Sequence, residues 1–432
     1  MTQVRRLRIR FALPCALGLL LAGLIGAAGC AYSLVSGGEV RPEPFHQIVE
    51  RTVRARGIAP ETEIRTRVIA SRELPGLLAE ALAAEWSGAE IHEYQEGLIT
   101  LGLWPAGRDL QREFVAVYAE EVVGLYLPTQ QTLFLVDDPG SSWSIRLLSS
   151  LVRRDLEREL ILSHELVHFL QHQAFPDLLE PDPFWKSQDD VTAAVQAALE
   201  GDALHYGIRS LEIDPPEEMK LRGGLEEEDQ QRSHGALAEA PALLRLTLAF
   251  PYANGYGLSL REGRSLLATP PASTEQVLHA EKRHEPFQAI DLAALRARLP
   301  AGCRAVFEDS LGELGLSVLL RDLGDPTQPA TWEGWDGDRW VAADCDGSRE
   351  LVWLTAWDSE ADAAEFAAGY ERIAPAVAER AGMPSPPAAR VVGSEVWIAT
   401  PGLAPLAGQL DALARRARVV DLQGVREFFR PE

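Results

Sequence analysis

The sequence predicts an α+β protein in which a mostly helical domain with an edge β-hairpin is followed by a smaller α+β domain. Most stretches between residues 73 and 211 repeat apolar residues at helical spacing, and one pair of β-prone runs interrupts them. Residues 335–341, 350–357 and 390–399 alternate as strands do, with helical stretches beside them. The chain has 432 residues, 46% of them hydrophobic, which suffices for two domains with separate cores.

The net charge of −23 argues against nucleic acid as a partner. Phosphate backbones favour basic patches, which so acidic a chain is poorly suited to present. The same charge disfavours binding to anionic lipid by electrostatic attraction alone. We therefore expect no nucleic-acid partner, and we expect any membrane attachment to use an N-terminal anchor.

Residues 1–30 have the three regions of an export signal in the usual order. Four arginines between residues 5 and 10 precede an apolar run over 11–28, and small residues lead to Cys30. The small residues before Cys30 resemble the bacterial lipobox, although Ala27 stands where Leu is more common. We expect Cys30 to be lipidated and the protein to be a cell-envelope lipoprotein on the periplasmic or extracellular face. The alternative is an uncleaved transmembrane anchor, since the run approaches the ~20 residues that span a bilayer.

The cysteine count agrees with export. Removal of Cys15 with the signal and lipidation of Cys30 leave Cys303 and Cys345 as the remaining pair. In an oxidising compartment we expect these two to form a disulfide. The alternative is two separate buried thiols, which behave as small hydrophobic side chains.

The first part of the exported chain is expected to be a linker followed by helices. Residues 31–60 are rich in Ser, Gly, Pro and charged residues and show little periodicity, which is typical of a linker. Helical spacing predicts helices over 73–86, 94–103 and 107–123. Two apolar, β-prone runs within 123–136 flank a turn at 128–131, which predicts a hairpin.

Two further helices, 150–173 and the alanine-rich 189–211, carry the functional motifs discussed below. Acidic residues dominate 211–240, which we expect to be a mobile surface loop. A helix is expected over 240–250. Ser273, with Gln276 three residues later, predicts a capping box at the start of another helix. We place these elements in one domain over residues 61–300.

The pattern changes at residue 301, and residues 301–432 predict the smaller α+β domain. Its expected helices cover 308–322, 359–380 and 406–417, and its expected strands are the three alternating runs given above.

Residues 164–168 read His-Glu-Leu-Val-His, a spacing that predicts a metal site. On a helix, residues four apart lie on one face about 6 Å apart along the axis, so His164 and His168 can bind one cation. Glu165 would then act as the general base on a water activated by zinc. The alternative is a helix whose histidines are simply hydrogen-bonded. The apolar neighbours at 160–163 argue against it, because buried ionisable groups need partners.

A catalytic zinc site needs a third protein ligand, and Glu200 is the best candidate. His172 lies about 12 Å along the helix axis from His164, too far for one ion to reach both, so we expect it at the rim or as an outer partner of the site. Glu200 lies on the next helix, where Gly201 would let the two helices approach closely. Asp202 and His205 are nearby alternatives, and Asp202 can also serve as an outer partner of a ligand histidine.

Several segments together resemble one family. The matching segments are residues 126–128 with 133–136, 164–171, 200–203, 250–255 and 270–279. In this order they resemble a group of secreted or lipid-anchored gluzincin-like zinc metallopeptidases, in which a Glu from a following helix completes a His-His-Glu site. Position 172, usually acidic in that group, is His here. The resemblance covers most of residues 90–285 and implies a zincin-like (gluzincin) fold. The metzincin pattern is excluded because it requires Gly at position 171 and His at 174, where this chain has Gln and Ala.

These residues predict a zinc-dependent metallopeptidase that cleaves a peptide or protein substrate. The edge of the hairpin would bind an extended peptide by strand addition. Tyr252 and His279 are the first candidates for the donor that stabilises the oxyanion, and Tyr206 and Tyr256 are further ones. Each of these side chains can also be an ordinary structural residue. Two other functions stay open: a catalytically inactive zincin-fold protein that serves as a binding or scaffolding lipoprotein, and a zinc hydrolase that acts on a non-peptide amide or ester.

Overall fold

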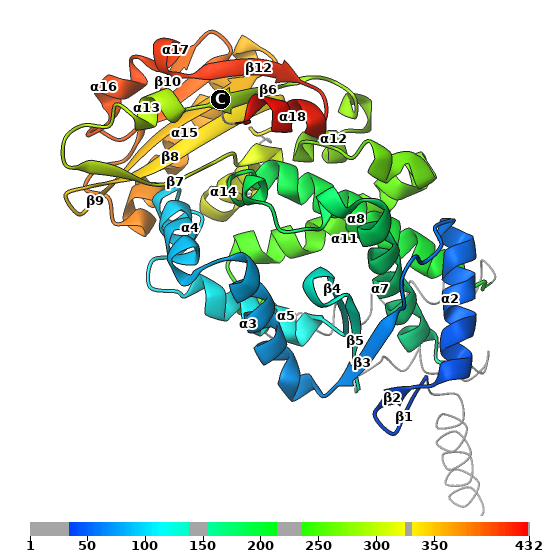
Figure 1. Ribbon diagram of the computed structural model, residues 1–432. Helices are drawn as coiled ribbons and strands as arrows, with labels where there is room; N and C mark the ends of the chain where they lie inside the picture. Colours follow the sequence, from blue (N-terminus) through cyan, green and yellow to red (C-terminus); the bar gives the residue numbers. More distant parts are fainter. Residues whose placement is uncertain (1–33, 138–153, 214–235, 325–330, 431–432) are drawn as a thin grey trace, which may run out of the picture. The chain divides into compact units, whose positions relative to one another are not determined.

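The computed structural model describes residues 34–137, 154–213, 236–324 and 331–430. The fold is α+β (Figure 1). The chain divides by its contacts into two compact units. Unit 1 takes its described residues from Met1–Arg72, Val123–Leu170 and Tyr206–Ser233, and unit 2 from Glu73–Val122, Gln171–His205 and His234–Glu432. The predicted signal over 1–30, with Cys30, lies outside the described residues, as do positions 214–235 of the predicted acidic loop.

The two units do not coincide with the predicted domains 61–300 and 301–432. Helices α4 (Gly88–Thr100) and α8 (Asp189–Ser210) share one apolar core with strands from the last third of the chain. A change of sequence pattern near residue 301 therefore marks a change of local structure, and the hydrophobic core continues across it.

Unit 1 contains a three-stranded sheet in the order β3-β5-β4. Strands β4 (Gly124–Leu127) and β5 (Thr132–Val136) form the predicted hairpin, and Gln131 closes its turn with a φ of 47°. Strand β3 (Arg65–Ile69) pairs with β5 in parallel, which leaves β4 at an edge. The edge hairpin is thus confirmed. Strand β3 was not predicted from the sequence, because it has only five residues, Arg-Thr-Arg-Val-Ile, and three of them are polar.

The linker prediction over residues 31–60 is wrong for the part that the structure describes. Strands β1 (Val35–Ser36) and β2 (Glu39–Val40) pair, and α2 (Pro42–Arg56) follows them. Ile48 of α2 is buried in a cluster with Leu34, Leu135 and Leu162. The apolar residues of α2, Phe45, Ile48, Val49 and Val53, recur at helical spacing and pack against two buried clusters, which stabilises the helix despite its charged composition. Its ends are also favourable, with Pro at the first turn and Gly57 in the left-handed conformation at the C-cap.

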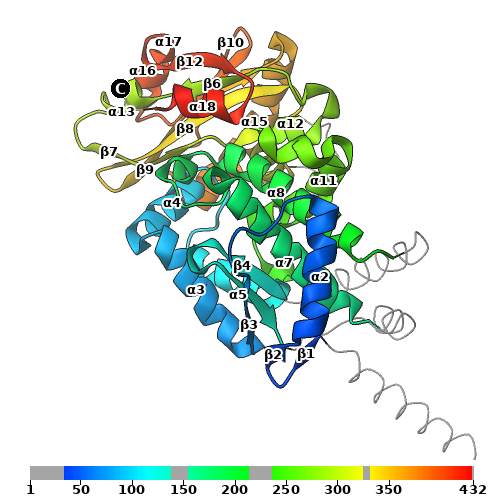
Figure 2. The same ribbon diagram turned by 45° about the vertical axis from the view of Figure 1, so that its right-hand side comes forward.

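Unit 2 contains a five-stranded antiparallel sheet in the order β10-β11-β9-β8-β7. The strands are β7 (Cys303–Asp309), β8 (Trp335–Cys345), β9 (Ser348–Trp357), β10 (Ala388–Val392) and β11 (Glu395–Ala399). Helix α14 (Gly312–Leu323), labelled in Figure 1, and helix α15 (Glu360–Ala381), labelled in Figure 2, contact this sheet. Strands β6 (Phe287–Asp291) and β12 (Arg415–Val419) form a separate antiparallel pair that contacts β8.

The side chains of the central strands point alternately into two hydrophobic cores of unit 2. Trp340 and Ala342 of β8 belong to the larger core, which α14 and α15 also line. Val341 and Ala343, one residue further along in each case, belong to the second core. That core is completed by β6 and the short helices α13 (Ala293–Arg296), α16 (Ala404–Ala407) and α17 (Leu410–Leu413). Both faces of the sheet are therefore buried.

Several predicted helices and the disulfide are confirmed, with shifts at their ends. Helices α3 (Leu74–Glu85), α4 and α5 (Leu110–Glu121) lie close to their predicted positions. Helix α11 (Ala242–Glu262) continues past Pro251, twelve residues beyond the predicted end at 250. The disulfide joins Cys303 and Cys345, which face each other on the paired strands β7 and β8.

Three local predictions need correction. Strand β7 occupies residues 303–309, so α14 begins at Gly312 instead of 308. The expected helix over 406–417 is replaced by two helical turns and strand β12, whose pairing with β6 overrides the helical spacing. Ser273 caps α12 (Thr274–Leu278) by accepting from Gln276 N, but the Gln276 side chain accepts from Ala272 N instead of returning to the cap residue.

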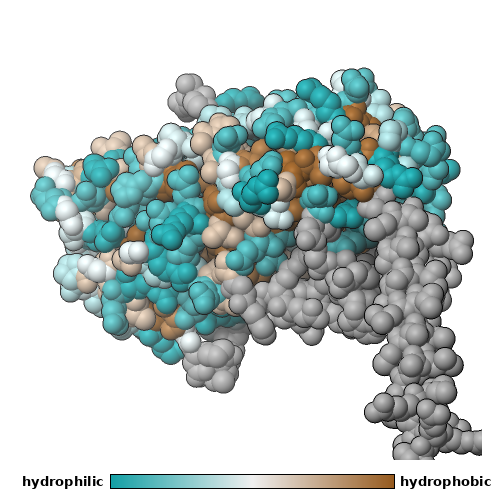
Figure 3. Space-filling model, turned by 90° about the horizontal axis from the view of Figure 1, so that it is seen from below, coloured by the Kyte–Doolittle hydropathy of each residue, from teal (hydrophilic) through white to brown (hydrophobic). Residues whose placement is uncertain are grey.

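The surface of the described residues carries few large apolar side chains. Those that are well exposed are Tyr252, Leu260, Leu278, Val391 and Val420. On the face seen in Figure 3, hydrophobic residues gather in a band between hydrophilic ones. No helix within the described ranges combines the length and the apolar character needed to cross a membrane.

Candidate metal centre

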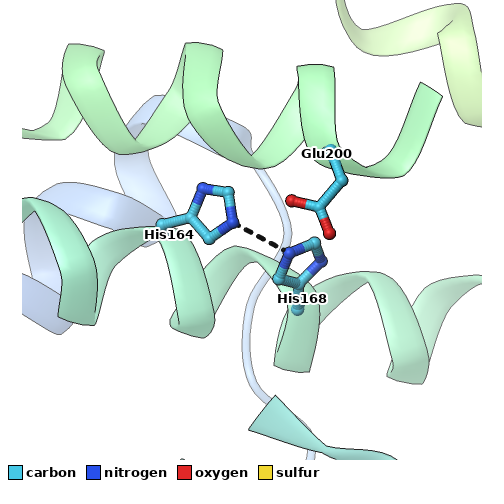
Figure 4. A group of neighbouring side chains, drawn as sticks. All are labelled: His164, His168 and Glu200. Atoms are coloured by element: carbon cyan, nitrogen blue, oxygen red, sulfur yellow. Dashed lines mark hydrogen bonds between the residues drawn. The ribbon is translucent and has the colours of Figure 1, made fainter. Parts of the chain in front are cut away.

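Three predicted ligands converge in the structure. His164 and His168 lie one turn apart on α7 (Leu156–Ala174), and Glu200 lies on α8 (Figure 4). One ligand atom from each residue lies within 4.8 Å of the other two. Within the part of the chain that the structure describes, this is the one group of three or more His, Cys, Asp or Glu residues arranged so closely.

The three side chains could hold a metal ion, and the spacing of the two histidines can be compared with that of a zinc site. Tetrahedral zinc, bound at about 2.0–2.1 Å from each ligand atom, sets those atoms about 3.3 Å apart. The Nε2 atoms of His164 and His168 lie 3.0 Å apart, close to that spacing. As a hydrogen bond, the contact between the two Nε2 atoms needs a proton on one of them. As metal ligands, both Nε2 atoms would have to be deprotonated. Two imidazoles and one carboxylate would leave a fourth coordination position open.

Close backbone approach places α8 beside α7, but at a different glycine from the predicted one. A Cβ built on Gly207 of α8 would lie 3.4 Å from His164 N, at ordinary van der Waals distance, so the backbones of α7 and α8 lie close together at this residue. Gly201, predicted to permit this approach, instead faces α11. A Cβ on Gly201 would lie 2.0 Å from the carbonyl oxygen of Gly255. The residue after Glu200 is therefore packed against α11, which fixes the position of the third ligand along α8.

Charged groups fix the start of α7 against the end of α8. Glu159 Oε2 accepts a hydrogen bond of 2.6 Å from Arg51 Nη2 of α2, and Arg154 binds the same carboxylate. Both arginines also donate to carbonyls at the end of α8: Arg51 Nε to O of its last residue, Ser210, at 3.0 Å, and Arg154 Nη1 to O of the next residue, Leu211, at 2.6 Å. Arg51 lies within the segment predicted as a linker, so sequence analysis missed a residue that supports the helices of the centre.

A second set of hydrogen bonds joins α7 to α8 close to Glu200. Gln171 Nε2 donates to Leu199 O at 3.0 Å and to Asp202 Oδ2 at 2.9 Å, and all three residues are buried. Asp202 was predicted as an alternative ligand or an outer partner, and the structure gives it this contact with Gln171. His205, the other alternative, lies 3.0 Å from Ser259 Oγ through its Nδ1.

The predicted general base lies against the edge strand. Glu165 is buried, and its Oε2 accepts a hydrogen bond of 2.6 Å from Tyr126 N of β4. Gly124 permits this approach, because a Cβ there would lie 2.3 Å from Ile161 Cγ2 and 3.2 Å from Glu165 Cγ. The structure thus brings β4 beside the motif helix, as expected, and it also gives the base a backbone partner that the sequence did not indicate.

The structure places the predicted oxyanion donors in varied surroundings. Tyr252 on α11 is 47% exposed, and His279 Nε2 lies 2.9 Å and 3.0 Å from the two carboxylate oxygens of Glu313 on α14. Tyr206 is buried beneath the Arg56 guanidinium, and the Tyr256 ring lies 6.0 Å from the His205 ring. His172 is buried, and its Nε2 lies 3.7 Å from Glu180.

One tyrosine near the centre was missed by sequence analysis. Tyr118 of α5 stacks on Phe114, with ring centroids 4.1 Å apart. Burial and then the charge of Glu200 raise the pKa of Tyr118 well above its ordinary value, which places its hydroxyl within electrostatic reach of that carboxylate. A tyrosine inside an ordinary amphipathic helix gives no sequence signal for such a position.

The start of α8 is held by a buried set of carboxyl groups. Asp190 Oδ1 accepts from Thr274 N at 2.9 Å and from Thr274 Oγ1 at 2.5 Å. Asp309 Oδ1, at the end of β7, accepts from Asp189 N at 2.9 Å. Burial raises the pKa of Asp190 to about 8 and that of Asp189 to about 6. The helix that carries Glu200 therefore begins in a network that is sensitive to protonation.

Comparison with known proteins gives one match. A family described as a domain of unknown function, DUF8575, matches residues 298–424. The matched range contains strands β7 to β11 of the five-stranded sheet, and it contains none of the three candidate ligands. No curated protein and no solved structure matches the chain.

Proposed function

We propose that the chain is a zinc-dependent metallopeptidase anchored at the cell envelope, with His164, His168 and Glu200 as its metal ligands. The observation that carries the proposal is the convergence of their ligand atoms within 4.8 Å. Two imidazole nitrogens and one carboxylate oxygen are the donor set of catalytic zinc sites that keep an open position. We propose a zincin-like fold for α7, α8 and the sheet β3-β5-β4 on the same ground.

The proposed chemistry divides between the metal and Glu165. A zinc ion held there would act as a Lewis acid on the scissile carbonyl and lower the pKa of a water molecule to about 7. Glu165 would accept a proton from that water and deliver it to the leaving amine. Its Oε2 is oriented by the Tyr126 N–H, so we assign the proton transfer to Oε1.

The proposed substrate is an extended peptide that lies along the edge strand β4. Edge strands present backbone donors and acceptors to which a peptide can add as a further strand. Tyr252, Tyr206, Tyr256 and His279 stay predictions for the oxyanion donor. Of these, His279 would first have to leave its contact with the Glu313 carboxylate.

The proposed location at the envelope is supported by the disulfide between Cys303 and Cys345. Such bonds persist in oxidising compartments and are rare in the cytosol. The lipid anchor at Cys30 is proposed from the sequence of residues 1–30 alone.

A second candidate is a binding or scaffolding lipoprotein that keeps the zincin-like fold but cleaves nothing. The hydrogen bond between Glu165 and Tyr126 N favours it, because this contact gives the carboxylate a place in the packing of β4 against α7 without any catalytic role.

Metal content tests the centre itself. The purified chain is supplied with zinc, dialysed and analysed by elemental mass spectrometry, beside His168→Ala and Glu200→Ala. The matched control is His172→Ala, a buried histidine one turn further along α7 and outside the cluster. We expect about one zinc per chain in the wild type and the control, and a loss in both ligand variants. A folded wild type that retains no zinc would overturn the proposal.

Peptide cleavage then separates the two candidates. The zinc-loaded chain is incubated with a mixed peptide library, and the products are followed by mass spectrometry, with Glu165→Gln as the matched inactive variant. Cleavage by the wild type that falls by at least about a hundredfold in Glu165→Gln supports the peptidase. Full zinc occupancy without Glu165-dependent cleavage supports the binding protein.

A further inference from the structure

Unit 2 contains a second feature with the character of a binding site. A cavity of about 1040 Å³ is lined by residues from β6, α13, β7, β8, β12, the short helix η4 (Pro183–Ser187) and α18 (Leu422–Phe428) with the residues after it. None of the three candidate metal ligands lines it. Its volume is at the upper end of those that hold small ligands or part of a peptide.

The lining of this cavity is basic, in contrast to the chain as a whole. Its charged residues are Arg296, Arg339, Arg415, Arg426, Arg430, Asp182, Asp291 and Glu308. Five guanidinium groups against three carboxylates leave an excess of two positive charges, in a protein whose net charge is −23. A cavity walled by low-dielectric protein focuses such a charge and attracts anions.

The arginines differ in how fully they are committed to internal partners. Arg339 is almost completely buried and bonds to Glu308 and to Ser187 O, so it is structural. Arg415 pairs with Asp291 while its side chain stays 55% exposed. Arg430 is exposed, and among the described residues it has no carboxylate partner. Arg415 and Arg430 are therefore the two best placed to bind an incoming carboxylate.

Aromatic rings hold several of these guanidinium groups in place. Arg415 lies 4.2 Å over the Phe428 ring, and Arg426 lies 4.7 Å over Phe184. Stacking leaves the edge of the planar guanidinium, where its N–H groups point, directed away from the ring. At that edge Arg415 already donates to Asp291, and Arg426 to Asp182. Phe307 and Phe429 also line the cavity and supply apolar surface for neighbouring side chains.

The cavity runs along the edge of the five-stranded sheet. Strand β7 ends the strand order and, among the described strands, pairs with β8 alone. Its residues 305–308 line the cavity. Val306 lies at a bulge and has no register partner on β8. An edge strand beside a basic cavity offers two kinds of recognition at once: backbone hydrogen bonds and charge.

We propose that this cavity binds an extended acidic peptide segment of a partner protein, which adds to the edge of β7 as a sixth strand. In such a strand, alternate side chains lie about 7 Å apart on one face, so acidic residues at every second position can reach separate arginines. The four exposed or partly exposed arginines come from α13, β12, α18 and the residue pair after it, spread along the cavity instead of converging on one point. Three of them pair with carboxylates of the lining, which an incoming acidic strand would have to displace or share. That spread fits a row of carboxylates better than one compact anion. The inference goes beyond the proposed metal centre and does not depend on it.

The test is binding of a defined peptide to the full chain carrying Glu165→Gln, so that proteolysis cannot consume the probe. The probe is a fluorescein-labelled peptide in which valine alternates with glutamate, followed by fluorescence anisotropy. One control peptide has glutamine in place of every glutamate. Another carries N-methyl groups on alternate backbone nitrogens, which block strand pairing on one edge. We expect the acidic peptide to bind at least about tenfold more tightly than either control.

Paired variants locate the site. Arg415→Gln is compared with Arg390→Gln, because Arg390 lies over the Trp397 ring in the same way but does not line the cavity. Arg430→Gln is compared with Arg372→Gln, an exposed arginine on α15. We expect about fivefold weaker binding in each cavity variant and no change in its control. Equal binding of the glutamine peptide or the N-methylated peptide would overturn the proposal, as would equal effects of cavity and control variants.

Discussion

The backbone N–H of Tyr126 on the edge strand β4 donates a hydrogen bond of 2.6 Å to Glu165 Oε2 on the motif helix α7. These residues lie 39 positions apart in the chain, and the contact fixes the carboxylate that sequence analysis assigned as the general base. It also uses one backbone donor, the Tyr126 N–H, of the strand edge along which the proposed substrate would pair. The close approach that permits it depends on Gly124.

Gly124→Ala is expected to weaken this contact. The added methyl group would lie 2.3 Å from Ile161 Cγ2 and 3.2 Å from Glu165 Cγ, so β4 or α7 must shift. We expect a loss of about 1–3 kcal/mol in the free energy of unfolding and lower cleavage activity with zinc content unchanged. Urea unfolding and the peptide assay measure both. The control is Gly76→Ala on α3, where a Cβ meets nothing within 4 Å and unfolding should be unaffected or slightly harder. Equal results for the two variants would contradict the prediction.

Gly201→Ala should disturb the third ligand. Its Cβ would lie 2.0 Å from Gly255 O, and both partners are helix backbone, which cannot move as a side chain can. We expect at least about 2–3 kcal/mol of destabilisation, and zinc retention weakened relative to the wild type because Glu200 precedes this residue. Unfolding and zinc content are measured on the same preparation. A variant with wild-type zinc content and stability would show that α8 and α11 separate more easily than their packing indicates.

Arg51→Met tests the support given by the predicted linker. Arg51 is largely buried and joins Glu159 to Ser210 O, so its replacement leaves two acceptors with fewer donors. We expect about 1–3 kcal/mol of destabilisation. Arg54→Met on the same helix is the matched control, because Arg54 and its partner Glu212 are both well exposed and their ion pair contributes little. The prediction fails if both variants unfold at the same urea concentration.

Asp190 should make stability fall as pH rises toward 8. Burial raises its folded-state pKa to about 8 from an ordinary value of 3.8, so between these values the folded chain holds a proton that the unfolded chain releases. The stability that protonated Asp190 contributes is fully present below about pH 4 and is lost as pH rises to about 8. Over this range the free energy of unfolding falls by up to about 1.4 kcal/mol per pH unit. Asp190→Asn keeps the acceptor for Thr274 and removes the ionisation. The free energy of unfolding is measured for the wild type and for Asp190→Asn from pH 5 to 8. It should fall more steeply with pH in the wild type.

The matched control for that comparison is Asp411→Asn, an exposed carboxylate that is 77% accessible. Its curve should run parallel to that of the wild type. A wild type and an Asp190→Asn variant with parallel curves would show that Asp190 stays ionised in the folded chain.

Loss of the disulfide should lower stability without changing the metal centre. Cys303 and Cys345 lie 42 residues apart, and a cross-link over such a loop is worth about 3–4 kcal/mol by its effect on the unfolded chain. The double variant Cys303→Ser with Cys345→Ser should unfold at lower urea concentration and retain zinc as the wild type does. A reduced wild type provides the control for the serine substitutions, and unchanged unfolding in both would contradict the estimate.

Local patterns in the sequence determined much of the helical structure and the identity of the cluster. The four-residue spacing of His164 and His168 and the periodicity of α8 around Glu200 are properties of single helices, so they can be read without knowledge of the fold. The β4–β5 hairpin and the disulfide also follow from short-range or compositional signals.

Tertiary structure alone decided the contacts that position these residues. Helix α2 was predicted as a linker because its few apolar residues form a core only by packing against distant residues such as Leu135 and Leu162. Gly207 lies beside α7 and Gly201 faces α11, because the two glycines are on different faces of α8. The Arg51–Glu159 pair spans 108 residues, and the Tyr126–Glu165 bond joins a strand edge to a helix. Such pairings depend on how whole elements pack, and no local sequence pattern encodes the packing of two distant segments.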